Sequence, residues 1–219
     1  MFIMNIWELA KRKLSYNSLR WKLRLLSEEL RGLDFTREHT SQEIGTDPII
    51  SHGYYSSGNK YLINVLKSLA ISTTDNIIDS GCGKGGAMRV MLSFPFSRVD
   101  GVEISERLAA IARKNFQILR IPSERCRVIA MDASQFQDLD PYNYIYFFNP
   151  FPGAVMIKVM AKLLASMERK PRKVTIIYNN PTCHDEIVGT GVFRKIGEYP
   201  YEWGLKFFVY CNGPYNGNE

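Results

Sequence analysis

Short apolar runs alternate with stretches of helical periodicity along most of the chain. In the stretches apolar residues recur about three or four positions apart, as in amphipathic helices, whereas the runs are continuous, as in buried strands. The predicted helices cover residues 61–70, 86–94, 106–119 and 154–169. The predicted strands cover residues 76–79, 99–104, 127–131, 142–148 and 174–178. This alternation predicts a parallel sheet with helices on both faces.

The order changes after Pro181, where a short predicted helix precedes two further strand-like runs. These runs, Phe193–Tyr199 and Leu205–Cys211, are separated only by a turn that contains Pro200 and Gly204. Because a parallel return needs a crossover of about a dozen residues, the two strands must be antiparallel. We therefore expect an α/β fold whose mostly parallel sheet ends in an antiparallel C-terminal strand pair.

The N-terminal segment is a predicted helical extension. The pattern predicts two helices, or one helix bent near residues 15–18, each with one apolar stripe. The apolar residues at helical spacing are Ile3, Trp7, Ala10, Leu14, Leu19, Leu23, Leu26, Leu30 and Leu33. We expect the stripe to pack on the main domain and the basic opposite face to be solvated. A substrate-binding lid, a dimer contact and a basic surface for nucleic acid or anionic lipid are the alternatives.

A polar stretch between Gly32 and Gly58 links the extension to the regular pattern. Long irregular loops in compact domains are usually functional or disordered. We therefore divide the chain into residues 1–52, a helical extension and loop that acts as a lid or faces the substrate, and residues 53–219, the main domain.

Charge is distributed unevenly between these two parts. The chain has 219 residues, 45% of them hydrophobic, which suits one globular domain with a buried core. Its formal net charge is +6, and residues 1–27 hold six basic residues against one acidic residue, Glu8. The rest is close to neutral, so the basic extension is where we expect contact with a polyanion or a partner protein.

The cysteines and the apolar runs indicate a cytoplasmic protein. No run reaches the roughly 20 apolar residues that cross a bilayer, and the N-terminus lacks the pattern of a secretory signal. Four widely separated cysteines fit reduced thiols rather than a disulfide scaffold or a metal knuckle, and they are Cys82, Cys126, Cys183 and Cys211. The three histidines lack metal-ligand spacing, so we predict no metal site.

The strongest chemical signal is a glycine-rich turn between the first predicted strand and the next helix. Asp79 ends the strand, and Gly81, Gly83, Gly85 and Gly86 follow. Glycine is needed where the backbone takes positive φ or where a ligand touches the main chain. The spacing fits both the dinucleotide fingerprint and the S-adenosylmethionine loop. A tight turn without a ligand is the remaining alternative.

Glu103 ends the second predicted strand, 22 residues after Gly81. A carboxylate at this distance accepts hydrogen bonds from the hydroxyls of an adenosine ribose in both kinds of cofactor. A solvated surface glutamate is the alternative. Glu103 therefore predicts an adenosine without choosing the chemistry attached to it.

Two features favour S-adenosylmethionine. The third strand ends in Asp132 and Ala133, where the aspartate can accept a hydrogen bond from an adenine amino group. The fourth strand ends in Asn149-Pro150-Phe151, at the carboxyl edge where ligands bind in open α/β sheets.

These motifs as a set resemble a class I (Rossmann-like) S-adenosylmethionine-dependent methyltransferase, over about residues 53–211. The resemblance extends, through the stretch from Phe35 and the turn at Gly53-Tyr54, to small bacterial methyltransferases that are distantly similar to non-SET histone lysine methyltransferases. It implies a Rossmann-like, doubly wound, seven-stranded sheet with the antiparallel end described above, and S-adenosylmethionine as cofactor.

The resemblance also implies roles for individual residues. The methionine part of the cofactor would be held by Asp79 and by the backbone of Gly81, Cys82, Gly83 and Gly85. Glu103 would hold the ribose, Ile104 would pack on the adenine, and Asp132 with Ala133 would bind its polar edge.

The acceptor side is assigned to Asn149 and Tyr54. In amino-methylating relatives an Asn-Pro-Pro-aromatic turn accepts hydrogen bonds from the target amine, and the aromatic residue of this chain comes one position earlier, at Phe151. Asn149 is also counted with the cofactor-binding residues. For Tyr54, packing against the first helix of the domain is the alternative.

The expected function is transfer of a methyl group by in-line displacement to an acceptor, with an amine nitrogen of a protein or small molecule as one class. Two alternatives stay open at this point. One is a module of the same fold that binds the cofactor or RNA without catalysis, and the other is an NAD-linked oxidoreductase.

Overall fold

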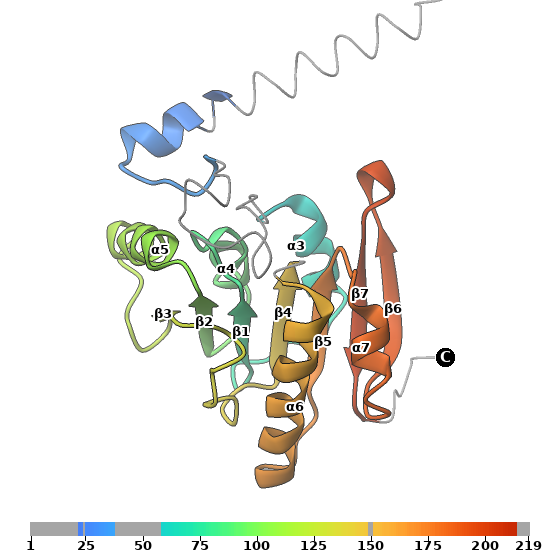
Figure 1. Cartoon of the computed structure of the whole chain (residues 1–219). Helices are drawn as coiled ribbons and strands as arrows, with labels where there is room; N and C mark the ends of the chain where they lie inside the picture. The colour runs from blue at the N-terminus through green and yellow to red at the C-terminus, as the bar shows by residue number, and fades with distance from the viewer. Residues whose placement is uncertain (1–21, 24, 38–57, 149–150, 214–219) are drawn as a thin grey trace, which may run out of the picture.

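A seven-stranded sheet runs through the computed structural model of the chain, which describes residues 22–23, 25–37, 58–148 and 151–213 (Figure 1). The strands are β1 (Asn76–Ser80), β2 (Arg98–Glu103), β3 (Val128–Ala130), β4 (Tyr144–Phe148), β5 (Thr175–Asn179), β6 (Arg194–Pro200) and β7 (Lys206–Cys211). Their order in the sheet is β3-β2-β1-β4-β5-β7-β6, and β7 runs in the direction opposite to the other six strands. The predicted fold class is confirmed, and each predicted strand is present with shifts of a few residues at its ends.

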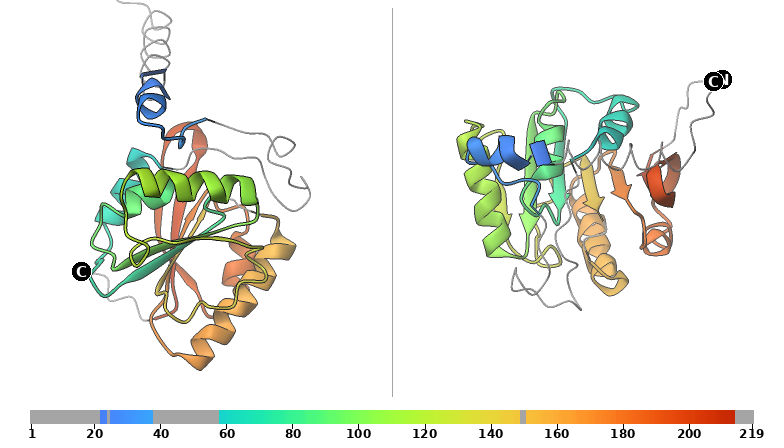
Figure 2. Two further views of the ribbon diagram at one scale, coloured as in Figure 1. Left: turned by 90° about the vertical axis from the view of Figure 1, so that its left-hand side faces the viewer. Right: turned by 90° about the horizontal axis from the view of Figure 1, so that it is seen from above.

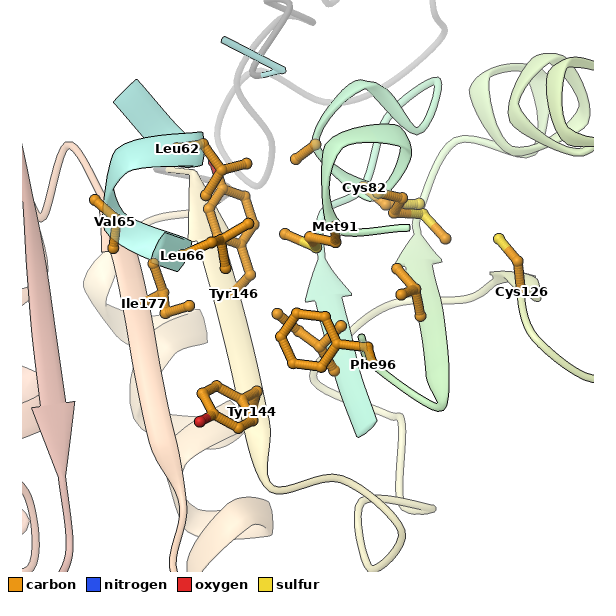
Figure 3. Packing of buried hydrophobic residues seen from close by; sticks show 14 of the residues in the cluster. Leu62, Val65, Leu66, Cys82, Met91, Phe96, Cys126, Tyr144, Tyr146 and Ile177 are labelled. Carbon is orange, nitrogen blue, oxygen red and sulfur yellow. The ribbon is translucent and has the colours of Figure 1, made fainter. Parts of the chain in front are cut away.

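Helices cover both faces of the sheet (Figures 1 and 2). They are α3 (Lys60–Lys67), α4 (Gly86–Met91), α5 (Glu106–Ile118), α6 (Gly153–Arg169) and α7 (His184–Val188), with a 3-10 turn at Glu202–Gly204. The buried residues form two clusters, one on each face. The first takes its helical residues from α3, α4 and α5, and the second from α6 and α7. Figure 3 shows the first cluster, with Tyr146 of β4 lying against Leu62 and Leu66 of α3.

Local signals set where the helices begin and end. The Asn59 side chain accepts hydrogen bonds from the backbone N–H groups of Tyr61 and Leu62 and so caps α3. The Ser105 side chain caps α5, with Glu106 in its first turn. Helix α3 ends at Lys67, before the predicted end at residue 70, because the Ser68 hydroxyl and N–H both bond to the Val65 carbonyl and tighten the last turn.

The N-terminal extension differs from its prediction in how its apolar stripe packs. Residues 22–23 and 25–30 are helical, but Leu23, Leu26 and Leu30 are exposed, Leu30 by 80%. Only Leu33 of the described part of the stripe is buried, at 4% exposure. The part of the stripe before residue 22 lies outside the described residues.

The reason is a sharp reversal of the chain at Gly32. Gly32 has φ 69, its N–H donates to the Glu29 carbonyl, and the Leu33 N–H donates to the Glu28 carbonyl. This is a Schellman helix end, which glycine at positive φ permits. The chain therefore leaves the helix toward the domain, and Leu33 and the fully buried Phe35 enter the first core cluster.

Among the described residues, no helix combines the length and the hydropathy needed to cross a membrane.

Candidate functional site

The sequence-predicted site residues within the described ranges gather at the carboxyl edge of the parallel strands. The glycine-rich loop follows β1, Glu103 ends β2, and Asp132 follows β3. The strand order reverses between β1 and β4, because β2 and β3 lie on one side of β1 and β4 and β5 on the other. In open α/β sheets ligands bind at this switch point, outside the carboxyl ends of the strands.

The glycine-rich loop takes a backbone path that needs its glycines. Gly81, Gly83 and Gly85 have φ values of 91, 53 and 83. A Cβ on Gly85 would also lie 2.6 Å from the ring of Phe116 on α5. The loop is held against β2 because the N–H groups of Gly81 and Cys82 both donate to the Val102 carbonyl, at 2.8 and 3.0 Å.

Glu103 fastens this loop to the end of β2. One carboxylate oxygen accepts from the Gly83 N–H at 2.8 Å and the other from the Ser105 N–H at 2.9 Å. Burial raises the pKa of Glu103, and the backbone hydrogen bonds from Ser105 and Gly83 oppose that rise. A carboxylate oxygen has more than one lone pair, so each oxygen can still accept from a ribose hydroxyl.

Asp79 is buried, with 1% of its surface exposed, and neither of its carboxylate oxygens has a hydrogen-bond partner. Burial, and then the nearby Glu103 carboxylate, raises the pKa of Asp79 well above its ordinary value. A buried carboxylate without partners is costly and is rare unless a ligand completes it. The negative charge and free lone pairs of Asp79 fit a ligand with an ammonium group.

Ile104 and Met131 form an apolar patch beside Glu103. Glu103 pairs with Ala130 across β2 and β3, so Ile104 and Met131 are the next residues along the two strands. Both are large apolar residues, yet they are 39% and 42% exposed. Sequence reasoning selected Ile104 and missed Met131, although its place directly before Asp132 was a usable signal.

Asp132 and Ala133 begin the turn after β3. One Asp132 oxygen accepts from the Ser134 N–H at 2.7 Å, which fixes the side chain as a turn former. Both residues are half-buried.

The Cys82 side chain points into the first core cluster (Figure 3). It is 3% exposed, and a Cβ on Gly101 would lie 2.6 Å from its sulfur. Burial, followed by the charges of Asp79 and Glu103, raises the pKa of the Cys82 thiol well above its ordinary value. The helix N-terminus therefore does not activate the thiol, and the Cys82 side chain has a packing role.

The loop also holds a buried lysine that sequence reasoning missed. Lys84 is fully buried, and its Nζ donates to Asp34 Oδ1 at 2.6 Å and to the Arg37 carbonyl at 2.8 Å. The Asn115 side chain of α5 accepts from the Asp34 N–H and donates to the Asp34 and Lys84 carbonyls. The segment around Asp34 is thereby tied to the glycine-rich loop, although the sequence places it in the extension.

The Glu28 carboxylate orders the same segment from the other side. It accepts from the N–H groups of Phe35 and Thr36, at 3.0 and 2.9 Å, and from the Thr36 hydroxyl at 2.9 Å. Arg89 of α4 lies 3.7 Å from Glu28 and stacks over the Phe35 ring. Residues 28–37, which we call the strap, therefore pack against the glycine-rich loop and α4.

Asn149 and Tyr54, the predicted acceptor-side residues, lie outside the described residues, as does Pro150. The described chain resumes at Phe151, which is 5% exposed and packs edge-on against Phe147 of β4 at 6.0 Å. Within the described part of the chain, no group of His, Cys, Asp and Glu residues has the arrangement of a metal site.

Comparison with known proteins identifies the domain. Residues 77–172 match the family described as a methyltransferase domain. No curated protein matches the chain.

Several solved structures share the fold. An RNA methyltransferase from Salinibacter ruber, solved with S-adenosyl-L-homocysteine, has a TM-score of 0.56 at 16% identity over 74% of this chain and 99% of its own. A glycopeptide N-methyltransferase, solved with S-adenosyl-L-methionine, has a TM-score of 0.56 at 13% identity, over 74% of this chain and 96% of its own. A putative methylase from Haemophilus influenzae has a TM-score of 0.55 at 17% identity, over 71% of this chain and 90% of its own.

The family match includes β1, the glycine-rich loop, Glu103 and β4, and it decides between the two cofactor interpretations of the loop. The chain contains a methyltransferase domain of the class I, Rossmann-like fold and is an S-adenosylmethionine-dependent methyltransferase.

Proposed function

We propose that S-adenosylmethionine binds along the carboxyl edge of β1, β2 and β3, and that the methyl acceptor binds beside it at the end of β4. The acceptor class that we propose is an amine nitrogen of a small molecule or protein. The unpaired, buried carboxylate of Asp79 is the observation that carries the cofactor assignment.

The residues present suit each part of the cofactor. Asp79 would pair with the α-ammonium group, because an opposite charge removes the cost of its burial. The glycine-rich loop allows close approach of the ligand to the backbone, since a side chain at Gly81, Gly83 or Gly85 would be strained at these φ values. Glu103 would accept from the ribose hydroxyls.

The adenine would lie on the exposed apolar patch of Ile104 and Met131. Burial of two large apolar side chains that are about 40% exposed would contribute to binding through the hydrophobic effect. Asp132 retains an oxygen that can accept from the adenine amino group, and Ala133 follows it in the turn. The family resemblance assigned Asp132 and Ala133 to this edge, and their position after β3 supports it.

The bound cofactor supplies an electrophilic methyl group on a sulfonium. The residues of the chain have to align the nucleophile with that methyl group and exclude water, and such positioning can contribute roughly 7–11 kcal/mol to lowering the barrier. An amine must lose a proton before it attacks. On the acceptor side we propose Asn149 as a hydrogen-bond acceptor for the amine and Tyr54 as a second polar contact, both from sequence.

We further propose a cytoplasmic location, and contact between the basic N-terminal extension and a polyanion or a partner protein.

The experiment is to incubate the full chain with methyl-labelled S-adenosylmethionine and bacterial cell extract. The extract is then sorted into protein, nucleic-acid and small-molecule fractions, and calorimetry measures binding of S-adenosylhomocysteine. We expect label in the small-molecule or protein fraction with Asn149→Ala lowering transfer. Label only in nucleic acid would overturn the amine proposal, and binding without transfer to any fraction would favour a non-catalytic module.

A further inference from the structure

We propose that Asn179 positions the methyl acceptor, by donating a hydrogen bond from its side-chain Nδ2 to a lone pair on an oxygen or ring nitrogen next to the methylated atom. The inference rests on the proposed acceptor site at the end of β4. It names a second group of that site and the chemistry that the group recognises.

Asn179 lies at the right place in the sheet. It is the last residue of β5 and pairs with Phe148, the last residue of β4, whose chain continues to Asn149. On its other side it pairs with Phe207 of β7. The side chain thus starts from the carboxyl edge, next to the strand end where the acceptor is proposed to bind.

Asn179 also lies on the same face of the sheet as Asp79. Residues paired across strands share a face, and residues two apart on one strand do too. Asp79 pairs with Tyr146, and Tyr146 pairs with Ile177, which is two residues before Asn179. Asp79 and Asn179 therefore lie on the same face, on either side of β4, and Asn179 is two residues beyond the position level with Asp79.

The amide of Asn179 is half satisfied. Asn179 is fully buried, its Oδ1 accepts from the Tyr201 hydroxyl at 2.6 Å, and its Nδ2 has no hydrogen-bond partner. A buried amide N–H without a partner is costly, and most buried polar side-chain atoms have one. Asp79 is the other residue of this edge with that property, and its missing partner is assigned to the cofactor. The Nδ2 group of Asn179 is therefore suited to the second ligand of a two-substrate site, the methyl acceptor.

Neighbouring aromatic rings hold the Tyr201 hydroxyl in place beside the amide. The Tyr201 ring stacks on Tyr61 of α3 with centroids 4.6 Å apart and lies 5.4 Å from the Phe207 ring. The Tyr201 hydroxyl donates to Oδ1 of Asn179, so the Oδ1 end is engaged and the Nδ2 end is the one left for a ligand.

The backbone next to Asn179 ends the strand. Asn180 has φ 52, in the left-handed region that residues other than glycine adopt infrequently. Among those residues Asn tolerates it best. The Asn180 N–H donates to the Lys206 carbonyl at 2.9 Å, which holds the turn in place. β5 therefore ends at Asn179, and the Asn179 side chain stays at the carboxyl edge of the sheet.

The unpaired Nδ2 group of Asn179 is a neutral hydrogen-bond donor, and this limits which methyl acceptors can bind. A purely apolar amine would leave Nδ2 unpaired. An acceptor with a carbonyl, carboxylate, hydroxyl or ring-nitrogen lone pair close to the methylated atom would satisfy it. Discrimination between such an acceptor and its analogue without the lone pair should be large, because a buried polar group is left unpaired in the wrong complex.

The test uses Asn179→Asp in the full chain, because aspartate keeps the shape and the acceptor for Tyr201 but removes the donor. We expect transfer of label from S-adenosylmethionine to the extract fraction methylated by the wild type to fall at least tenfold, with the affinity for S-adenosylhomocysteine within threefold of wild type. With the isolated acceptor, the loss should appear mainly in KM if the bond is equally strong in ground and transition states.

Asn212→Asp is the matched control. Asn212 follows β7, and both ends of its amide are paired, with Oδ1 accepting from Val174 N–H at 2.7 Å and Nδ2 donating to the Arg172 carbonyl at 2.9 Å. This variant should lose thermal stability and keep transfer per folded molecule. Unchanged transfer by Asn179→Asp, or a parallel fall in cofactor affinity, would overturn the proposal.

A second measurement covers the case in which the wild type transfers label to no fraction, which would be a failure of the proposed function. Because Nδ2 has no partner in the free protein, the double variant Asn179→Val with Tyr201→Phe should melt at or above the wild-type temperature, whereas Asn212→Val should melt lower. A double variant that melts well below the wild type would mean that a water or another partner satisfies Nδ2, and the acceptor role would be refuted.

Discussion

Lys84 Nζ and Asp34 Oδ1 lie 2.6 Å apart, and this ion pair joins the glycine-rich loop to a segment some fifty residues earlier in the chain. The Lys84 side chain is fully buried, while that of Asp34 is 36% exposed. Burial lowers the pKa of Lys84, and its bond to Asp34 opposes that shift. The strap and the glycine-rich loop, which we propose to receive the cofactor, are thus one structural unit.

Asp34→Asn should destabilise the protein by about 1–3 kcal/mol, because it leaves a buried ammonium group with a weaker partner. It should also weaken S-adenosylhomocysteine binding, since the loop loses a restraint. Urea unfolding and calorimetry measure the two effects. Lys84→Met serves as the comparison, because it removes the buried charge and leaves unpaired only Asp34, whose side chain is 36% exposed, and it should cost less stability. Equal losses in the two variants would contradict the importance of the buried charge.

Gly85→Ala should disrupt the loop more than an alanine at another positive-φ glycine. The new Cβ would meet the buried Phe116 ring at 2.6 Å in addition to the strain of φ 83. We expect a loss of roughly 3 kcal/mol or more, of which backbone strain accounts for about 1–2 kcal/mol. Gly191→Ala is the control, since Gly191 has φ 70 and its new methyl group would have no neighbouring atom within 4 Å. It should show the strain alone, with unchanged cofactor affinity.

Asp79→Asn should raise the stability of the ligand-free protein and weaken cofactor binding. Cofactor affinity should fall at least tenfold because the ammonium group loses its charged partner, while the ligand-free protein should become more stable by on the order of 1 kcal/mol because a buried carboxyl group that is costly to ionise is gone. Thermal melting with and without S-adenosylhomocysteine measures both. A ligand-free protein destabilised by this change would contradict the view that Asp79 lacks a partner before binding.

The pH dependence follows from the raised pKa of Asp79. Above the ordinary aspartate pKa the unfolded chain gives up this proton while the folded protein keeps it, so the stability of the ligand-free protein should fall as the pH rises toward the folded pKa. The slope from this group is at most about 1.4 kcal/mol per pH unit, and Asp79→Asn should remove it. Cofactor affinity should change in the opposite direction and weaken as Asp79 becomes protonated.

Asp100→Asn is the matched control for Asp79→Asn. Asp100 is also fully buried, but it has partners in the Tyr142 hydroxyl at 2.6 Å, the Arg127 N–H at 2.8 Å and Arg98 Nε at 2.8 Å. Removal of this charge should destabilise the protein by about 2–4 kcal/mol and leave cofactor affinity unchanged.

Removal of residues 1–21 should abolish any salt-sensitive binding to heparin, used as a model polyanion, because it removes four of the six basic residues of residues 1–27. Cofactor affinity should not change. Removal of residues 1–37 takes away the strap as well, including the buried Leu33 and Phe35, and should lower the melting temperature and weaken cofactor binding. Heparin affinity measured at two salt concentrations and calorimetry compare the two truncations. Retention of salt-sensitive binding after the shorter deletion would mean that the polyanion binds to the rest of the chain and not to residues 1–21.

The sequence was sufficient to predict the sheet and to place the candidate cofactor-binding residues at its carboxyl edge, because both depend on local signals. Glycine spacing, apolar runs and an acid at the end of β2 are set by residues close together in the chain. The roles of Lys84, Asp34 and Asn115 depend on contacts between distant segments, and nothing in the local pattern marks a lysine in a loop as buried. The packing of Leu23, Leu26 and Leu30 was predicted wrongly, since helical periodicity indicates an apolar face but does not indicate what covers it, and the turn at Gly32 directs only the residues after it toward the core.

The position of β7 between β5 and β6 has a consequence for synthesis on the ribosome. β7 is the last strand of the described chain to be made, yet it is an interior strand that pairs with neighbours on both sides. Until residues 206–211 emerge, β5 presents an unpaired edge and β6 has no sheet to join. An open strand edge of this kind can pair with other nascent chains. The growing protein therefore stays exposed to misassembly until its last described strand is inserted.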